Sequence, residues 1–539
     1  MEKFRFKKNA IIGAADADED SKFLKATFID TGVLSILRDC NDHRSIVLGR
    51  TGAGKTALLN MLYNNEEHTI RILPESLSLS YISNSNILNF VSKAGVKIDI
   101  LFRLLWRHII TVELLKTRYK INDEKSKKSF IQQMFEKFVV DKKKQKAIEY
   151  LIEWGESFWK ETEYRIKEVT TKLESDLKGA IQAGGFTFAS LTAESAEKLS
   201  KEQKAEVIQR AQEVVNKVQI RELSSIIDIL AEDIFTDPQQ RYFVIIDKLD
   251  EDWVDDNIRY RLIRALIETV RDFHKVKYFK IAIALRTDLI ERVFRFTRDS
   301  GFQEEKYESI FLNLLWDKEN LTRLLDSRID YMVKQQYTDM KVTHKDILPK
   351  KYDDKTKSSM DYIMDRTMMR PRDIILFFNT CIRFAENDPV INKSTLSQAE
   401  GEYSRSRLRA LADEWYVDYP DLQDSVIILK KRPFSFVLNQ IEDDMVDNFC
   451  LEHTASHENM KGIVTIACGY LDGKINRSDF KREIFGIYYK IGLVGFKTES
   501  FSNISWVYEG VRPAVSSSEI SDDTKVYIHK GFWRVLGTY

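Results

Sequence analysis

Short runs of apolar residues and long stretches of helical periodicity alternate along this chain of 539 residues, which contains only 8 prolines and 21 glycines. Residues 44–48, 242–246 and 278–285 are runs typical of central strands in a parallel sheet, buried on both faces. Residues 69–73 suit a further strand, and residues 256–273 suit a helix between two of these strands. The pattern therefore predicts a parallel sheet built from βαβ units inside a mostly helical protein.

The stretch from residue 119 to residue 235 differs from the apolar runs on either side of it. It begins with a lysine-rich segment, and its apolar residues then step by three and four positions, the spacing of one helix face. Residues 180–190 alternate in character and contain two glycines, which suggests a small hairpin. We expect this block to be a long helical insertion, preceded by an apolar helix over residues 98–118.

Helical patterns continue beyond the last of the long apolar runs. Amphipathic helices are expected over residues 321–337 and 372–386, outside the sheet. The region after residue 400 is expected to hold helices at 434–450, 460–470 and 478–490, then strand-like pieces at 506–508 and 526–529. Three helices followed by a two-stranded wing is the order of a winged-helix domain, which we therefore expect at the C-terminal end.

The chain is too long for one core, and about two to four domains are expected. We divide it into an N-terminal tail (1–25), a sheet domain (26–300), a helical lid (301–400) and a C-terminal winged-helix-like or interaction domain (401–539). The 83 Lys and Arg balance 83 Asp and Glu, so net charge gives no argument for a nucleic acid or a membrane partner. No apolar run could span a membrane, no signal peptide is evident, and four scattered cysteines predict no disulfide framework, so we expect a cytoplasmic protein.

Candidate chemistry begins directly after the first apolar run, where residues 49–56 read Gly-Arg-Thr-Gly-Ala-Gly-Lys-Thr. This is a complete Walker A motif between a predicted strand and a predicted helix, so its backbone amides and the helix N-terminus should hold phosphates. Lys55 should reach the β- and γ-phosphates, and the Thr56 hydroxyl should bind Mg²⁺. The residues expected to bind the nucleotide are Gly49, Arg50, Thr51, Gly52, Ala53, Gly54, Lys55, Thr56 and Ala57.

The apolar run over residues 242–246 leads into a group of acidic residues. Asp247 at the strand end is placed to hold Mg²⁺ through water, as in a Walker B motif. The next residue is Lys248, so the adjacent Asp–Glu pair common in such motifs is absent. Glu251 and Asp250 are the two candidates for the carboxylate that orients the attacking water, and we prefer Glu251 by a small margin.

The Asp-x-Leu-Asp-Glu sequence that begins at Asp247 resembles the Walker B motif of the STAND ATPases, especially the NACHT group, and of the related KAP ATPases. These families belong to the additional-strand branch of P-loop proteins, which also contains the AAA+ ATPases. The strand ending at Arg286 looks like their sensor-1 strand, and residues 369–373 look like the start of a sensor-2 helix. The resemblance implies a P-loop core with ATP and Mg²⁺ as cofactors, in which Arg286 and Arg372 touch the γ-phosphate.

The residues by themselves leave other roles open for both arginines. Arg286 follows a buried strand and could form a structural salt bridge instead of meeting a ligand. Arg372 stands near a helix start, where a cation opposes the helix dipole, and it could pair with Asp373 or Asp365. Each arginine is therefore a candidate site residue with a structural alternative.

We expect an α/β P-loop ATPase that binds and hydrolyses ATP as a molecular switch or motor. By analogy with its families, it would act in antiviral defence, as a homo-oligomer or with a separate effector protein. One alternative is a nucleotide-gated scaffold with little hydrolysis, suggested by Lys248. Another is a DNA-binding ATPase of origin-recognition or repair type, suggested by the winged-helix-like C-terminal region with Arg477, Lys481 and Arg482 near a helix start, so DNA or RNA is a candidate partner.

Overall fold

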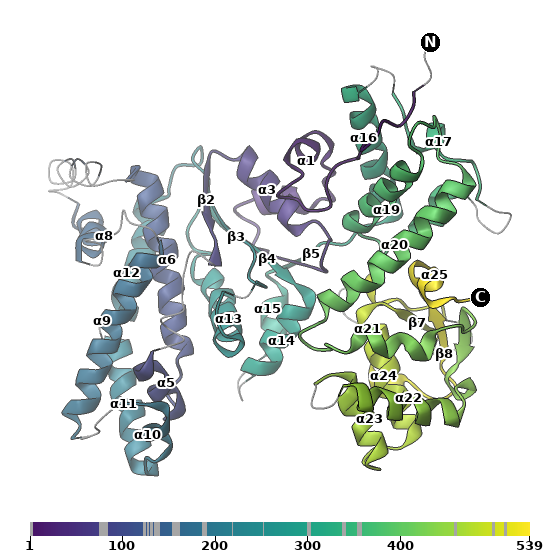
Figure 1. Ribbon diagram of the computed structural model, residues 1–539. Helices are drawn as coiled ribbons and strands as arrows, with labels where there is room; N and C mark the ends of the chain where they lie inside the picture. Colours follow the sequence, from purple (N-terminus) through teal and green to yellow (C-terminus); the bar gives the residue numbers. More distant parts are fainter. Residues whose placement is uncertain are drawn as a thin grey trace. The chain divides into compact units, whose positions relative to one another are not determined.

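The computed structural model describes most of the chain (Figure 1). The residues that it does not describe are 1–3, 75–84, 122–140 apart from 126, 129 and 133, then 154–161, 186–190, 218, 252, 299–302, 337–340, 353–357, 458–460, 498–501 and 511–514. The chain divides into two compact units. The first unit contains residues 1–31, 49–57 and 313–539, and the second unit contains residues 32–48 and 58–312.

A parallel five-stranded sheet forms the centre of the second unit. Its strands are β1 (Ile46–Gly49), β2 (His68–Ile72), β3 (Tyr242–Ile246), β4 (Phe279–Arg286) and β5 (Phe311–Asn313), in the order β2-β3-β4-β1-β5. In the parallel register, Thr69 lies opposite Phe243, which lies opposite Lys280. Every residue of β3 is buried, as expected of a central strand. The four predicted strands are confirmed, and the three-residue strand β5 was not predicted.

The helix α13 (Asp256–Asp272) connects β3 to β4 and so completes the predicted βαβ unit. It packs along α6 (Asp99–Tyr119), where the indole of Trp106 donates a 2.9 Å hydrogen bond to the carbonyl of Leu262. Most side chains of α6 are buried, which explains why apolar residues recur along its whole length. Both helices were predicted, and both are confirmed.

The described part of the insertion is helical, as predicted. Its helices are α8 (Lys142–Glu153), α9 (Thr162–Ala183), α10 (Ala193–Glu197), α11 (Lys201–Lys217) and α12 (Gln219–Ile229). In Figure 1, α9, α11 and α12 lie side by side with α6. The hairpin predicted over residues 180–190 is wrong in its first part, because α9 continues to Ala183 with Ile181 buried in the core. Residues 186–190 lie outside the described residues.

The first unit contains a helical core formed by α16 (Lys318–Gln336), α18 (Ser359–Met364), α19 (Pro371–Phe384) and α20 (Lys393–Glu414). The amphipathic helices predicted over residues 321–337 and 372–386 are therefore confirmed as α16 and α19. The N-terminal segment, which we expected to be a tail, packs into this core. Phe6 and Ile12 are completely buried, and Asp20 forms a buried ion pair with Arg328 of α16.

A second core of the first unit contains the C-terminal helices α22 (Asp443–Ser456), α23 (Ile463–Leu471) and α24 (Arg477–Ile491). These helices accompany an antiparallel sheet of β6 (Ser435–Val437), β7 (Val494–Lys497) and β8 (Lys525–Ile528), in the order β6-β8-β7. The helices predicted at 460–470 and 478–490 and the strand at 526–529 are confirmed.

Two details of this C-terminal region differ from the sequence prediction. The helix expected over residues 434–450 begins only at Asp443, because residues 435–437 pair with β8. The strand expected at residues 506–508 is wrong, since Val507–Glu509 form a turn of 3-10 helix. The indole of Trp506 instead covers Gly495 of β7, where an added Cβ would lie 2.8 Å from the ring.

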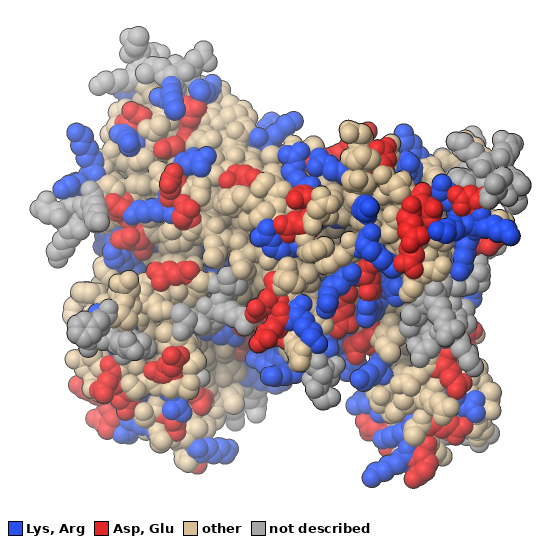
Figure 2. Space-filling view, turned by 180° about the vertical axis from the view of Figure 1, so that it is seen from behind, with Lys and Arg blue, Asp and Glu red and all other residues tan. Residues whose placement is uncertain are grey.

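Charged side chains of both signs are interspersed over the face drawn in Figure 2, in keeping with the balanced composition. Among the described residues, no helix is both long enough and apolar enough to cross a membrane.

Candidate functional site

The Walker A residues form a loop that connects β1 to α3 (Lys55–Asn65) in the predicted strand–loop–helix order. Gly52 and Gly54 have φ angles of +78° and +94°, in the left-handed region that residues with a Cβ rarely adopt. The ammonium of Lys55 donates hydrogen bonds to the carbonyls of Gly49, at 2.9 Å, and Arg50, at 3.1 Å. Because α3 begins at Lys55, the free amides of its first turn and its dipole are placed to attract an anion.

The start of α19 lies against this loop within the first unit. The backbone N–H of Arg372 donates a 3.3 Å hydrogen bond to the carbonyl of Gly52. An added Cβ on Gly52 would lie 2.8 Å from the Cβ of Arg372, so only glycine fits here. The indole of Trp316 also donates a 2.8 Å hydrogen bond to the carbonyl of Ala53. The structure therefore brings the predicted sensor-2 segment to the predicted phosphate-binding loop.

The guanidinium of Arg372 makes no hydrogen bond or ion pair with any residue that the structure describes. The two carboxylates that could have paired with it are engaged elsewhere: Asp373 pairs with Arg370 and Arg407, and Asp365 pairs with Lys530. Arg372 is half-buried. A half-buried cation beside a glycine-rich loop, with neither expected acid bound to it, suits a negatively charged ligand.

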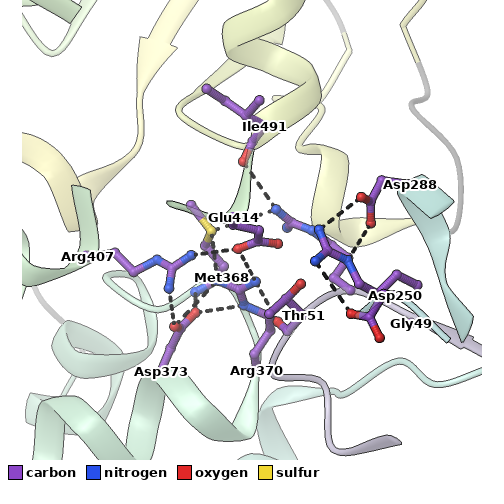
Figure 3. A network of polar contacts seen from close by, with 12 residues as sticks. Gly49, Thr51, Asp250, Asp288, Met368, Arg370, Asp373, Arg407, Glu414 and Ile491 are labelled. Carbon is purple, nitrogen blue, oxygen red and sulfur yellow. Dashed lines mark hydrogen bonds and ion pairs between the residues drawn. The ribbon is translucent and has the colours of Figure 1, made fainter. Parts of the chain in front are cut away.

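A buried network of charged side chains contacts the loop at the carbonyl of Thr51 (Figure 3). This network was not predicted from the sequence. The guanidinium of Arg370 donates a 2.7 Å hydrogen bond to the carbonyl of Thr51 and pairs with Asp373 at 3.0 Å. Arg407 of α20 pairs with Asp373 at 3.4 Å and with Glu414 at 3.2 Å. All four charged side chains of this network are at least nine-tenths buried.

Asp373 is the central carboxylate of that network. Burial by itself would raise the pKa of Asp373, but the charges of Arg370 and Arg407 more than offset this and hold the pKa far below its ordinary value. Burial likewise disfavours the charged form of Arg370, whereas Asp373 and Glu414 raise its pKa above the ordinary range. Both groups are therefore ionised at neutral pH, as members of a paired cluster.

In the second unit, the acidic residues after β3 lie in a tight turn. The backbone N–H of Lys248 donates a 2.8 Å hydrogen bond to the carboxylate of Asp247, and Lys248 has a φ angle of +60°. The carbonyl of Glu251 accepts a 2.9 Å hydrogen bond from Arg259 of α13. Leu249 between them is completely buried. The turn that carries Asp250 and Glu251 is thus fixed at the end of β3 by the helix that follows it.

Arg286 at the end of β4 forms ion pairs within the second unit. Its guanidinium makes two 2.9 Å hydrogen bonds to Asp288 and lies 3.6 Å from the carboxylate of Asp250 (Figure 3). Arg292 of α14 (Thr287–Thr297), the helix that carries Asp288, also donates to Asp288, at 2.9 Å. These contacts match the structural alternative for Arg286, so a γ-phosphate would have to compete with two carboxylates for this side chain.

The structure thus groups the candidate residues in two sets. Lys55, Thr56 and Arg372 belong to the first unit, while Asp247, Asp250, Glu251 and Arg286 belong to the second unit. The joint Mg²⁺ site of Thr56 and Asp247 stays a prediction. What the first unit shows on its own is a loop with two glycines of positive φ and a half-buried cation beside it.

Comparison with known proteins locates a family resemblance in the helical part of the first unit. Residues 319–412 match the FunZ-associated C-terminal helical domain. This match runs from α16 to α20, the helices that carry Arg370, Arg372 and Arg407. The chain is also 23% identical to the "Putative transposon gamma-delta 80.3 kDa protein" of Escherichia coli (strain K12) over 544 residues. That similarity covers 97% of this chain, and the chain spans 66% of the length of that relative.

Proposed function

We propose that this chain is a Mg²⁺-dependent P-loop ATPase that binds and hydrolyses ATP and works as a molecular switch. The observation that carries the proposal is the loop of residues 49–56, with its two left-handed glycines and the half-buried Arg372 beside it. Backbone amides, a helix N-terminus and one cation are the groups that hold polyphosphates in P-loop proteins. We propose ATP as the nucleotide because the chain resembles the STAND and KAP ATPases.

The proposal gives each candidate residue a separate role. Lys55 exchanges the carbonyls of Gly49 and Arg50 for the β- and γ-phosphates, which are stronger acceptors because they are charged. Thr56 and Asp247 hold Mg²⁺, directly and through water respectively. In the sheet order, β4 lies between β1 and β3. The loop follows β1, and Asp247 follows β3. Such placement is typical of ligand sites at the carboxyl edge of a parallel sheet.

Nucleotide binding can be tested with a fluorescent ATP analogue, titrated against the full chain with Mg²⁺ and with EDTA. Replacing Lys55 by alanine removes a charged donor to the phosphates, and such hydrogen bonds contribute about 1.5–3 kcal/mol each, so affinity should fall roughly 10- to 150-fold. Lys474→Ala is the control, because Lys474 pairs with Asp472 and both side chains are exposed. Equal affinity of wild type and Lys55→Ala, or no binding by wild type, would refute the proposal.

Hydrolysis needs a separate measurement of phosphate release at saturating ATP. Glu251→Gln should slow turnover at least ~10²-fold if Glu251 orients the attacking water, since general bases typically contribute about 10²–10⁴-fold. Asp250→Asn tests the second candidate, whose carboxylate lies 3.6 Å from Arg286. Tight binding with phosphate release that neither substitution slows would favour the nucleotide-gated scaffold.

We do not extend the proposal to a nucleic acid substrate. The three cations that suggested one are engaged within the C-terminal region: Arg477 pairs with Asp443 and Asp447, Arg482 pairs with Asp479, and Lys481 is buried against the carbonyl of Ile441. The relative's name contains the word transposon, which is a statement about that protein and names no ligand of the site described above. The resemblance to STAND and KAP ATPases supports the role in antiviral defence and the effector partner.

A further inference from the structure

Arg50, the second residue of the phosphate loop, has a side chain that reaches the C-terminal region of the first unit. Its Nη2 donates a 3.2 Å hydrogen bond to the carbonyl of Ile491, the last residue of α24, and lies 3.8 Å from the sulfur of Met368. Its Nη1 is buried without a hydrogen-bond partner among the described residues. Burial, aided by the nearby Arg370, lowers the pKa of Arg50 to about 10, so this guanidinium is still charged at neutral pH.

The contact with Ile491 is a cap on the end of α24. The last four carbonyls of a helix have no donor within the helix, and the helix dipole makes that end negative, so a guanidinium there is stabilising. The next residue, Gly492, has a φ of +86°, and an added Cβ there would lie 3.1 Å from Nη2 of Arg50. The chain then enters β7, so the cap holds the junction between α24 and β7.

The backbone of Arg50 belongs to the proposed phosphate site. Its carbonyl accepts hydrogen bonds from the Lys55 ammonium, at 3.1 Å, and from the N–H of Ala53, at 3.1 Å. A phosphate that draws the Lys55 ammonium to itself removes the first of these bonds and immobilises the amides of the loop. One residue therefore carries both a backbone that responds to phosphate and a side chain that caps α24.

We propose that Arg50 couples nucleotide occupancy of the loop to the order of the α24–β7 junction. The inference rests on the proposed function and deepens it: ATP is the regulator, and the end of α24 is the element that responds. A loop fixed by phosphate holds the Cα of Arg50 in place and so strengthens the cap. Because coupling between two sites is reciprocal, formation of the cap raises nucleotide affinity by the same factor.

The test measures amide hydrogen exchange of residues 488–497 in the full chain, with and without a non-hydrolysable ATP analogue and Mg²⁺. Binding should slow exchange there by about 5-fold or more, the lower end of typical coupling between sites. In Arg50→Ala the analogue should still bind, because the loop amides and Lys55 remain, with affinity reduced by no more than that same factor. The exchange at residues 488–497 should then no longer respond to the analogue, and Arg50→Lys should restore part of the response.

Lys481→Ala is the matched control. Like Arg50, Lys481 is a buried cation that donates to a backbone carbonyl, in its case that of Ile441 at 2.8 Å. Lys481 belongs to α24, so its loss weakens the helix that Arg50 caps and leaves the loop unchanged. This variant should keep the response of residues 488–497 to the analogue. A response that survives in Arg50→Ala, or its absence in a wild type that binds nucleotide, overturns the coupling alone. A wild type that binds no nucleotide overturns the proposed function, and the coupling with it.

Discussion

The substitution Asp373→Asn tests whether the buried charges beside the loop of residues 49–56 stabilise the first unit. It keeps the size and shape of the side chain and an oxygen that can accept the 3.1 Å hydrogen bond from the N–H of Met368. It removes the negative charge that Arg370 and Arg407 share. Asp373 is completely buried, so water does not replace the lost partner.

The size of the effect follows from the charges left behind. Removing one partner of a buried ion pair typically costs about 3–5 kcal/mol, because the remaining charge stays buried without compensation. In Asp373→Asn, the guanidinium groups of Arg370 and Arg407 would share one carboxylate of the network, that of Glu414. For a unit of this size, such a loss should lower the unfolding temperature by roughly 5–15 °C. We therefore expect the unfolding of the first unit to be strongly affected.

The assay is urea and thermal unfolding of the full chain, followed by tryptophan fluorescence and circular dichroism. Asp365→Asn is the matched control, because Asp365 pairs with Lys530 where both side chains are 41% exposed. An exposed pair contributes only about 0.2–1 kcal/mol, so this variant should unfold almost like wild type. A loss below about 1 kcal/mol for Asp373→Asn, or equal losses for both variants, would refute the role that we assign to the buried cluster.

The pH dependence gives a second check on the same substitution. The folded pKa of Asp373 is depressed below its unfolded value, so its stabilisation is fully present above the ordinary carboxyl pKa and is lost as the pH falls below it. The difference between wild type and Asp373→Asn should therefore stay constant from pH 8 to pH 5. It should shrink only in more acidic solution, below about pH 4.

Three further predictions concern other residues of the first unit. Gly52→Ala should weaken nucleotide binding and stability more than Gly54→Ala, because both have positive φ but only the first new Cβ would meet a neighbour within 3 Å, as thermal unfolding and titration would show. Burial lowers the pKa of His529 to about 3, so its folded pKa lies below the unfolded value. Stability should then fall by about 2 kcal/mol between pH 7 and pH 5, and His529→Gln should flatten this slope in urea titrations. A thiol reagent at pH 8 should modify the exposed Cys468 quickly and the buried Cys450, whose pKa burial raises to about 12, only after unfolding, as mass spectrometry would show.

The elements that the sequence predicted well are those whose burial is set by local pattern. The strands β3 and β4 are buried on both faces, and short runs of apolar residues are typical of such strands. β5 was missed because three residues carry no period, and its place depends on the hydrogen bonds that the N–H groups of Ser45 and Ile46 donate to the carbonyl of Ile310, the residue before β5. The start of α22 was misjudged for a similar reason, since β6 exists only through its pairing with β8.

The candidate site shows a sharper limit of sequence reasoning. The motif at residues 369–373 contains two arginines, and the sequence favoured Arg372 without separating their roles. Pro371 begins α19, so Arg370 is the N-cap residue with extended backbone, and Arg372 lies within the first turn. That difference in backbone sends Arg370 to Asp373 and to the carbonyl of Thr51, and leaves Arg372 without either expected partner. Thr51 lies far from Arg370 in the chain, so no local pattern reveals that contact.

The loop and its surroundings carry more positive charge than their own carboxylates balance. Four guanidinium groups lie in or beside the loop, those of Arg50, Arg372 and the two arginines of the buried network, Arg370 and Arg407, whereas Asp373 and Glu414 are the carboxylates of that network. Burial is the main cause that lowers the pKa of Arg50; the charges of Arg370 and Arg407 add to it, while Glu414 and Asp373 oppose it. Buried like charges are retained at a cost in stability unless a ligand neutralises them. A polyphosphate in the loop would supply the missing negative charge, so the same imbalance that weakens the free unit favours the ligand that we propose.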